Sequence, residues 1–360
     1  MTFPMERSPA TLSAADRVLL VRLGAVGDVL RALPAVRRIR GTFPGLHLAW
    51  IVEDLSRPLV DGHPDVDTVI PFPRREMRAF DRPGAFLATL RGLRSRLRET
   101  DFTAAIDLQS TFKSGAVALL SGAPRRIGFA PGHCRELSFL FSNEWTPLSS
   151  PWLNRVDRNL EMAAALGARD GAADAVLPEE PEEGRAAAAL LEDLVPGGGP
   201  AVVFSPGVSR RQSWKAWPGW HYGRLAGLLH RSLGIRPILA WGPGEEDLAR
   251  SIARAAGPSA VLAPPTGLRL LAALLRRSTL FVGADTGPMH LAWVTGCRVV
   301  ALFGPTDPRL NAPPGDGHSV LRSADRTMAA LAPDTVHDAV VRTLAAAPPR
   351  RPSAARETAP

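Results

Sequence analysis

The spacing of apolar and polar residues divides the chain into short apolar runs that alternate with segments of helical period. Residues 17–23 (RVLLVRL) form an apolar run followed by turn residues, which is typical of a buried strand. Residues 28–40 carry apolar residues at helical spacing with a basic outer face, which predicts an amphipathic helix. Strands are also expected over 47–52 and 103–108, the latter followed by a helix over 113–122. This succession predicts βαβ units on a parallel sheet.

The second half of the chain repeats this alternation. It predicts strands and helices in turn over 200–207, 219–234, 236–242, 245–257, 260–262, 267–278, 279–285, 287–296 and 298–304. The fold class is therefore α/β, with two Rossmann-like parallel domains. Because open parallel sheets bind ligands beyond the carboxyl ends of their strands, we expect the functional residues in the strand-to-helix loops, facing a cleft between the domains.

Shifts in composition suggest where these domains begin and end. Pro, Gly and acidic residues around one alanine-rich helix mark a linker region, and the last residues are of low complexity. The expected order is a loose tail over 1–15, an N-terminal domain over 16–168, a linker region over 169–199, a C-terminal domain over 200–325, a helix over 326–345 and a disordered tail over 346–360.

Composition indicates where the protein is located and what kind of partner it binds. No apolar run reaches the roughly 18 residues of a membrane helix, and the first residues lack the apolar core of a signal peptide, so a cytoplasmic protein is expected. The net charge of +8 favours anionic partners. Two cysteines far apart have no metal-ligand spacing. The charge comes from 41 arginines and only two lysines, and both lysines fall inside motifs.

The first motif is LGAVGD at 23–28, directly after the first predicted strand. Gly24 and Gly27 allow a tight turn and close approach of a ligand to the backbone. Asp28 has two compatible interpretations: a helix N-cap, or a carboxylate that takes a proton from an attacking hydroxyl. A GxxG turn alone does not separate them, and it is neither a dinucleotide fingerprint nor a P-loop.

The second motif is DLQSTFKSG at 107–115, at the end of another predicted strand. Gln109, Ser110 and Lys113 are candidates for holding substrate hydroxyls or an anionic group. The alternative is a polar loop with a helix cap.

Two motifs of the second half suit a nucleotide diphosphate. In SPGVSRRQSWKAWP at 205–218, a strand end is followed by hydroxyls and cations, among which Lys215 is the best single candidate. In WGPGEED at 241–247, Glu245 or Glu246 is a candidate acceptor for ribose hydroxyls, although the helix dipole also explains acids there.

A third motif of the second half, GADTGPMH at 283–290, places a Gly loop before a helix N-terminus, which favours a phosphate. Thr286 adds a hydroxyl, and Gly287 an amide. Asp285 is an awkward neighbour for phosphate, so it either binds sugar hydroxyls or orients the loop. His290 lies one turn into the helix and either contacts the ligand or is structural.

Together these motifs resemble the ADP-heptose:lipopolysaccharide heptosyltransferase family. The matching segments occur in the family's order and cover most of 17–310: VRLGAVGDVLRALPAVRRIRGTFPG, DLQSTFKSG, RRIGF, SPGVSRRQSWKAWP, WGPGEED and GADTGPMHLAWVTGCRVVALFGPTDP. Within the family, LPAVRRIR, the DLQxxxKS block and RELSFLFSNEW look most like heptosyltransferase I.

The resemblance implies a GT-B fold and inverting transfer of heptose from an ADP-heptose donor to a Kdo-bearing lipid A acceptor. It implies that Asp28 is the general base, and that no cofactor or essential metal is needed. It places the donor against Ser205, Ser209, Lys215, Glu245, Asp285, Thr286, Gly287 and His290. It places the acceptor against Gly27, Arg74, Arg75, Arg78, Gln109 and Lys113. The alternative for the basic segment 74–82 is a solvated face.

A monomer is expected, and the positive charge favours peripheral contact with the cytoplasmic face of the inner membrane, where the lipid acceptor would lie. Competing interpretations are a related glycosyltransferase with another donor or a later acceptor, and a non-enzymatic nucleotide- or nucleic-acid-binding protein. Aromatic residues make up only 6% of the chain, and no basic-aromatic stripe is visible, which argues against nucleic acid. A dehydrogenase is disfavoured because LGAVGD lacks the fingerprint spacing.

Overall fold

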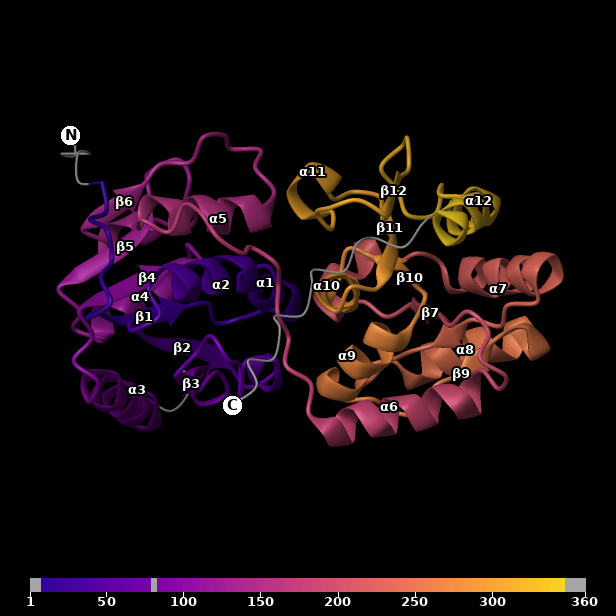
Figure 1. Cartoon of the computed structure of the whole chain (residues 1–360), viewed down its shortest axis with the longest axis horizontal. Coiled ribbons are helices and arrows are strands. Elements are labelled where there is room, and N and C mark those ends of the chain that lie inside the picture. The colour runs from indigo at the N-terminus through magenta and orange to yellow at the C-terminus, as the bar shows by residue number, and fades with distance from the viewer. Residues whose placement is uncertain (1–7, 79–82, 347–360) are drawn as a thin grey trace, which may run out of the picture. The chain divides into compact units, whose positions relative to one another are not determined.

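The computed structural model describes residues 8–78 and 83–346, except for the side chain of Arg78. Its contacts divide the chain into two compact units, with the boundary between Pro178 and Glu179 (Figure 1). Each unit is built on its own six-stranded sheet. The expected α/β class with two Rossmann-like domains is therefore confirmed.

The first unit contains an all-parallel sheet of order β3-β2-β1-β4-β5-β6. Its strands are β1 Arg17–Val21, β2 His47–Glu53, β3 Thr68–Phe72, β4 Ala104–Asp107, β5 Arg125–Phe129 and β6 Glu144–Thr146. Its helices are α1 Val26–Leu30, α2 Leu33–Thr42, α3 Pro83–Arg98, α4 Phe112–Leu120 and α5 Arg155–Ala165, with 3-10 turns η1 Arg57–Leu59, η2 Glu76–Arg78 and η3 Ser138–Phe141. The central strand β1 is apolar and fully buried after Arg17, as its unbroken apolar run predicts for a strand covered on both faces.

The second unit repeats this plan, with a parallel sheet of order β12-β11-β10-β7-β8-β9. Its strands are β7 Val202–Ser205, β8 Ile238–Leu239, β9 Val261–Leu262, β10 Leu280–Ala284, β11 Arg298–Phe303 and β12 Ser319–Arg322. Its helices are α6 Pro181–Leu194, α7 Gly219–Leu233, α8 Glu246–Ala256, α9 Leu268–Arg277, α10 Gly287–Val294, α11 Pro308–Asn311 and α12 Pro333–Ala345, with turns η4 Arg210–Lys215 and η5 Gly257–Ser259.

The predicted helix over 28–40 is two helices. It begins earlier, at Val26, and breaks at Arg31 and Ala32 before α2. Pro34 lies in the first turn of α2, where its missing N–H is tolerated, but it cannot continue a helix that began before it. The break keeps α1 short and separates its residues from those of α2.

Two segments outside the predicted domains pack onto them. The alanine-rich helix of the segment 169–199 is α6, which packs against α9 and forms an ion pair from Glu183 to Arg269, so it is part of the second unit. Leu12, in the predicted loose tail, is buried, and its N–H bonds the carbonyl of Leu166. Of the predicted disordered tail, 347–360 lies outside the described residues.

Helix α12 lies within the expected segment 326–345 and packs against α7 and β11 of the second unit. Over the described residues, the chain therefore passes from the first unit to the second only once. None of the helices in 8–78 and 83–346 combines the length and apolar composition that a membrane crossing needs.

Candidate active site

The first two motifs meet at one edge of the first sheet. Strands β1 and β4 are neighbours, with Val21 opposite Asp107, and the strand order reverses between them. The loops after these strands therefore leave the carboxyl edge side by side, at the point where doubly wound sheets bind ligands. Gln109 joins them, because its Oε1 accepts a hydrogen bond of 2.7 Å from the N–H of Leu23.

Asp28 is not a helix cap. It lies inside α1, whose N-cap residue is Ala25, so the capping interpretation is wrong. Its carboxylate is 3.1 Å from the guanidinium of Arg22 and also pairs with Arg31, and its side chain is 29% exposed. Burial alone raises the pKa of Asp28, but the charges of Arg22 and Arg31 outweigh burial and hold that pKa well below its usual range.

Asp107 holds the second motif in place through hydrogen bonds. Its Oδ1 accepts hydrogen bonds from the backbone N–H groups of Gln109 (2.9 Å) and Ser110 (3.0 Å), and Oδ2 accepts one from the hydroxyl of Ser114 (2.9 Å). Burial raises the pKa of Asp107 to about 6, although these hydrogen bonds oppose the rise. Asp107 thereby fixes the turn that carries Gln109.

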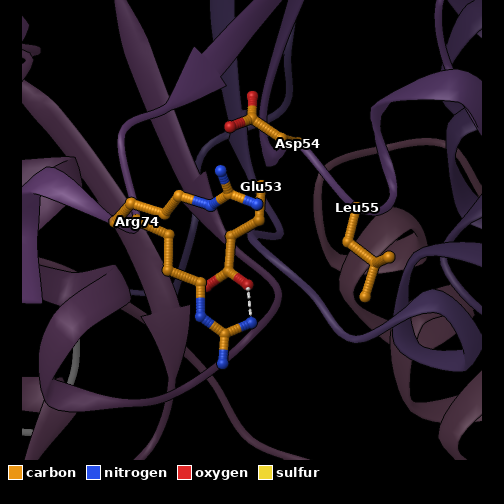
Figure 2. Close-up of a pocket in the computed structure, with 5 residues that line it drawn as sticks. Glu53, Asp54, Leu55 and Arg74 are labelled. Carbon is orange, nitrogen blue, oxygen red and sulfur yellow. Dashed lines mark hydrogen bonds and ion pairs between the residues drawn. The ribbon is translucent and has the colours of Figure 1, made fainter. Parts of the chain in front are cut away.

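Two of the predicted acceptor cations pair with a residue that was not predicted from the sequence, Glu53 at the end of β2. Glu53 is buried and forms ion pairs with Lys113, at 2.7 Å, and with Arg74. Figure 2 shows its carboxylate pointing toward the guanidinium of Arg74. Its side chain also lies across Gly24, where an added Cβ would be 3.1 Å from Oε2.

Glu53 and Arg74 line a pocket of about 560 Å³, together with Arg75, Asp54 and Leu55. Its lining includes two arginines, which suit an anionic ligand, and the carboxylate of Glu53 pairs with Arg74. Of the remaining predicted acceptor residues, Gly27 is buried within α1, and the side chain of Arg78 lies outside the described residues.

The donor motifs meet in the same way in the second unit, where β7 and β10 are neighbours and the strand order again reverses. Lys215, at the end of η4, reaches from the first loop to the second. Its Nζ is 3.0 Å from Oδ2 of Asp285 and donates to the Asp285 carbonyl at 3.1 Å. The indole of Trp214 lies against it, with Nζ 5.4 Å from the ring centre.

Asp285 is buried among polar partners. Besides Lys215, its carboxylate is 3.4 Å from Nε2 of His290 and accepts a hydrogen bond of 3.1 Å from Asn311. Burial raises the pKa of Asp285, but His290 and Lys215 outweigh burial and hold it well below its usual range. With this set of partners, the geometry favours the loop-orienting interpretation of Asp285 over contact with sugar hydroxyls.

The start of α10 has the features of an anion site. Thr286 is its N-cap residue, but its side chain does not cap the helix and instead bonds the carbonyl of Ala284 at 3.3 Å. The Thr286 side chain therefore leaves the backbone amides of the first turn, including that of Gly287, uncapped. The helix dipole at this N-terminus favours an anion.

The other donor candidates border this edge of the sheet. Ser205 ends β7 and is buried, whereas Ser209 is exposed in the following loop. Glu245 is the N-cap residue of α8, and its Oε2 accepts a hydrogen bond of 2.9 Å from the N–H of Gly242. Its carboxyl also lies over Gly207, where an added Cβ would be 2.0 Å away. The Glu245 side chain therefore packs against the Ser-Pro-Gly turn at 205–207.

Comparison with known proteins identifies the family of this chain. The family model for glycosyltransferase family 9 (heptosyltransferase) matches residues 90–338. The chain belongs to glycosyltransferase family 9. It is an enzyme of glycosyl transfer, and the resemblance seen in its motifs is confirmed.

Relatives and solved structures match this family 9 chain over nearly its whole length. It is 31% identical to lipopolysaccharide heptosyltransferase 1 of Escherichia coli (strain K12), over 85% of this chain and 93% of that protein. It is 31% identical to the enzyme of that name from Pseudomonas aeruginosa, over 81% and 79%. The structure of E. coli heptosyltransferase WaaC with ADP matches with a TM-score of 0.74 and 27% identity, over 91% of this chain and 99% of that one. The expected GT-B fold is thus confirmed.

Each of the site residues that were not predicted from the sequence contacts a residue that was predicted. Arg22 and Arg31 pair with Asp28, Glu53 pairs with Lys113, and Asn311 bonds Asp285. A polar residue at the end of an apolar strand, as at Arg22 and Glu53, was the available signal. In the described parts of the chain, no three His, Cys, Asp or Glu residues are grouped as metal ligands.

Proposed function

We propose that this family 9 enzyme transfers heptose from ADP-L-glycero-β-D-manno-heptose to the Kdo region of a lipopolysaccharide inner core, with inversion at the anomeric carbon. The observation that carries the proposal is the cation and helix N-terminus at the switch point of the second sheet. Lys215 and the first amides of α10 lie together there, as a diphosphate requires. A solved relative contains ADP-2-deoxy-2-fluoro heptose, which supports the choice of donor.

In the proposed reaction, Asp28 takes the proton of an acceptor hydroxyl while that oxygen bonds the anomeric carbon. The bond from this carbon to the diphosphate oxygen breaks, and ADP leaves with the electron pair. Lys215 and the amides at Thr286 and Gly287 stabilise the charge that develops on the diphosphate. Asp285 and Asn311 hold Lys215 and the loop in position. Glu245 accepts hydrogen bonds from the ribose.

The acceptor binds the first unit. Its anionic groups contact Arg74, Arg75 and Arg78, while Gln109, Lys113 and Gly27 border its sugar. The arginines and Lys113 around Glu53 support this placement. We propose that the enzyme is a monomer that contacts the cytoplasmic face of the inner membrane, attracted by its net charge of +8. It uses no cofactor and no essential metal, since Lys215 and backbone amides supply the positive charge.

The test is ADP release from ADP-heptose with Kdo-bearing lipid A, for the wild type, Asp28→Asn and the matched control Asp101→Asn. Asparagine preserves the shape of Asp28 but cannot accept the proton, so we expect a loss of about 100-fold or more in kcat. Asp101 is exposed and has a left-handed φ of 48°, which asparagine tolerates, so its variant should match the wild type.

Three outcomes separate the parts of the proposal. Activity of Asp28→Asn within about threefold of the control would mean that the base lies elsewhere. If the wild type releases no ADP on a verified acceptor, the donor or the acceptor is wrong, and ADP-glucose, UDP-sugars and acceptors that already carry one heptose are tried next. Release that does not depend on the acceptor is donor hydrolysis and contradicts the transfer.

A further inference from the structure

An exposed apolar surface lies on the first unit, where the turn η3 packs against α4. Four large apolar side chains there are between 49% and 61% exposed: Phe112 and Leu119 of α4, and Leu137 and Leu140 at η3. The two elements are in direct contact, because the ring centres of Phe112 and Phe141 are 4.9 Å apart and an added Cβ on Gly115 would meet the Phe141 ring at 2.6 Å. The four exposed side chains, here called the apolar patch, therefore form one surface rather than scattered residues.

The turn at Leu137 combines backbone strain with exposure. Leu137 has a left-handed φ of 56°, and Glu136 before it has a φ of 50°. This region is unfavourable for a residue with a branched side chain, whereas glycine and asparagine adopt it readily. The chain thus carries an exposed leucine at a position where a small polar residue would fold more easily. Strain of this kind is a reason to look for a function.

A basic face of α3 lies beside the apolar patch. Arg91, Arg94 and Arg98 are exposed and share one side of that helix, since they are three and four residues apart. Arg98 reaches the end of α4, where an added Cβ on Gly122 would be 3.2 Å from its Nε. Within residues 8–78 and 83–346, none of these three arginines forms an ion pair. Their charge is therefore open to an external anion.

The acidic residue next to Leu137 in the sequence does not neutralise this surface. The carboxylate of Glu136 accepts a hydrogen bond of 3.2 Å from the N–H of Phe112, so it is directed to the start of α4. Exposed apolar groups beside unpaired arginines match the surface of an anionic bilayer. There, cations attract the lipid headgroups, and apolar side chains enter the boundary between headgroups and acyl chains.

We infer that the apolar patch and the basic face of α3 together dock the enzyme on a bilayer that contains anionic lipids. The inference rests on the proposed function, which gives the enzyme an acceptor anchored in a membrane. It adds the surface that makes the contact. Lys113 follows Phe112 directly, and its Nζ is 2.7 Å from the carboxylate of Glu53, which lines the pocket proposed for the acceptor. Docking through the apolar patch therefore brings the lipid surface to the side of the enzyme that binds the lipid-linked substrate.

The first test is co-sedimentation of the full chain with vesicles, in the absence of donor and acceptor. One set of vesicles contains phosphatidylethanolamine and phosphatidylglycerol, and the other contains only neutral phosphatidylcholine. We expect the wild type to bind the anionic vesicles at least tenfold more tightly than the neutral ones, since each arginine near an anionic surface contributes roughly fivefold.

Two double variants separate the contributions to binding. Leu137→Asn with Leu140→Gln should weaken binding to the anionic vesicles about 20-fold, because roughly half of each leucine side chain would no longer leave water. Arg91→Gln with Arg94→Gln should weaken it by a similar factor. The matched controls are Leu233→Gln and Arg254→Gln, which change an exposed leucine of α7 and an exposed arginine of α8 and should bind like the wild type.

Leu137→Asn also separates binding from folding. Asparagine tolerates a left-handed φ better than leucine does, so the Tm of this variant should equal or exceed that of the wild type. Weakened vesicle binding without a fall in Tm then reports the lost apolar contact. If either double variant binds as tightly as the wild type, or if the controls lose as much, the inference is overturned. Sedimentation without lipid adds one more outcome: dimers that the leucine variant dissociates would make the patch an interface between copies of this chain, and would also overturn it.

An activity assay connects docking to the reaction. With the acceptor embedded in the anionic vesicles, the leucine double variant should have an apparent kcat/KM about tenfold below that of the wild type, because fewer enzyme molecules are on the surface. With a deacylated, water-soluble acceptor, it should match the wild type. An equal loss on both acceptors would mean that the leucines act on the active site and not on docking. Failure of the proposed function looks different, because neither acceptor would then support ADP release while vesicle binding is unchanged.

Discussion

Replacing Asp285 with asparagine removes the negative charge to which Lys215 is bound. Asp285 is only 4% exposed and the Lys215 side chain 11%, so water replaces little of the lost interaction. Removal of one partner from a buried pair costs about 3–5 kcal/mol, because the remaining charge stays desolvated. Asn311 keeps an oxygen to which it can donate, so we expect the lower value, about 3 kcal/mol. For a unit of this size, that lowers Tm by about 6–12 °C.

Calorimetry on Asp285→Asn and on the matched control Asp334→Asn tests this reasoning. Asp334 pairs with Arg224 in the same unit, but both side chains are more than half exposed, so the control should cost less than about 1 kcal/mol. The folded-state pKa of Asp285 is depressed, so its stabilising effect is present above about pH 4 and is lost as the pH falls toward the folded pKa. The difference between wild type and variant should shrink there. Equal Tm values for the two variants at pH 7 would refute the argument.

Four further substitutions give distinct readouts. Asp107→Asn should become more stable relative to wild type as the pH rises through about 6, by on the order of 2–3 kcal/mol, because the raised folded-state pKa of Asp107 makes its ionisation destabilising; urea unfolding at pH 4 and 8 measures this. Gly207→Ala places a Cβ 2.0 Å from the Glu245 carboxyl and should weaken ADP binding by about tenfold in titration calorimetry, with little loss of Tm. Gly115→Ala meets the Phe141 ring at 2.6 Å and should lower stability by about 1 kcal/mol, whereas Gly92→Ala, with nothing within 4 Å, should raise it by about 0.5–1 kcal/mol.

The fold could be predicted from the sequence because its main signal is local. Apolar runs such as 17–21 and 298–303 are long enough and apolar enough to be buried strands, and the motifs that follow them lie at strand ends in both sheets. The break after Leu30 was not predicted. The apolar spacing continues through it and suggested one uninterrupted helix, whereas Pro34 favours a new helix start.

The positions of the site residues could be predicted from the sequence, but their side-chain contacts could not. Asp28, Lys215 and Asp285 follow strands, and this alone assigns them to the correct edges. Their partners in the folded chain include Arg22, Arg31 and Asn311, which reach them from other loops. No periodicity carries that information, because side-chain pairing across a sheet edge depends on strand order. The capping interpretation of Asp28 was wrong for a similar reason, since the helix begins before it.

The single passage of the described chain between its units has an evolutionary consequence. Each sheet, with its own helices and core, is encoded by one continuous stretch on either side of Pro178 and Glu179. One recombination event at that point would exchange a whole unit between related genes without dividing either core. If the units bind different substrates, new pairs of donor and acceptor specificity can arise by such exchange. Chimeras joined at this position reproduce that route in the laboratory.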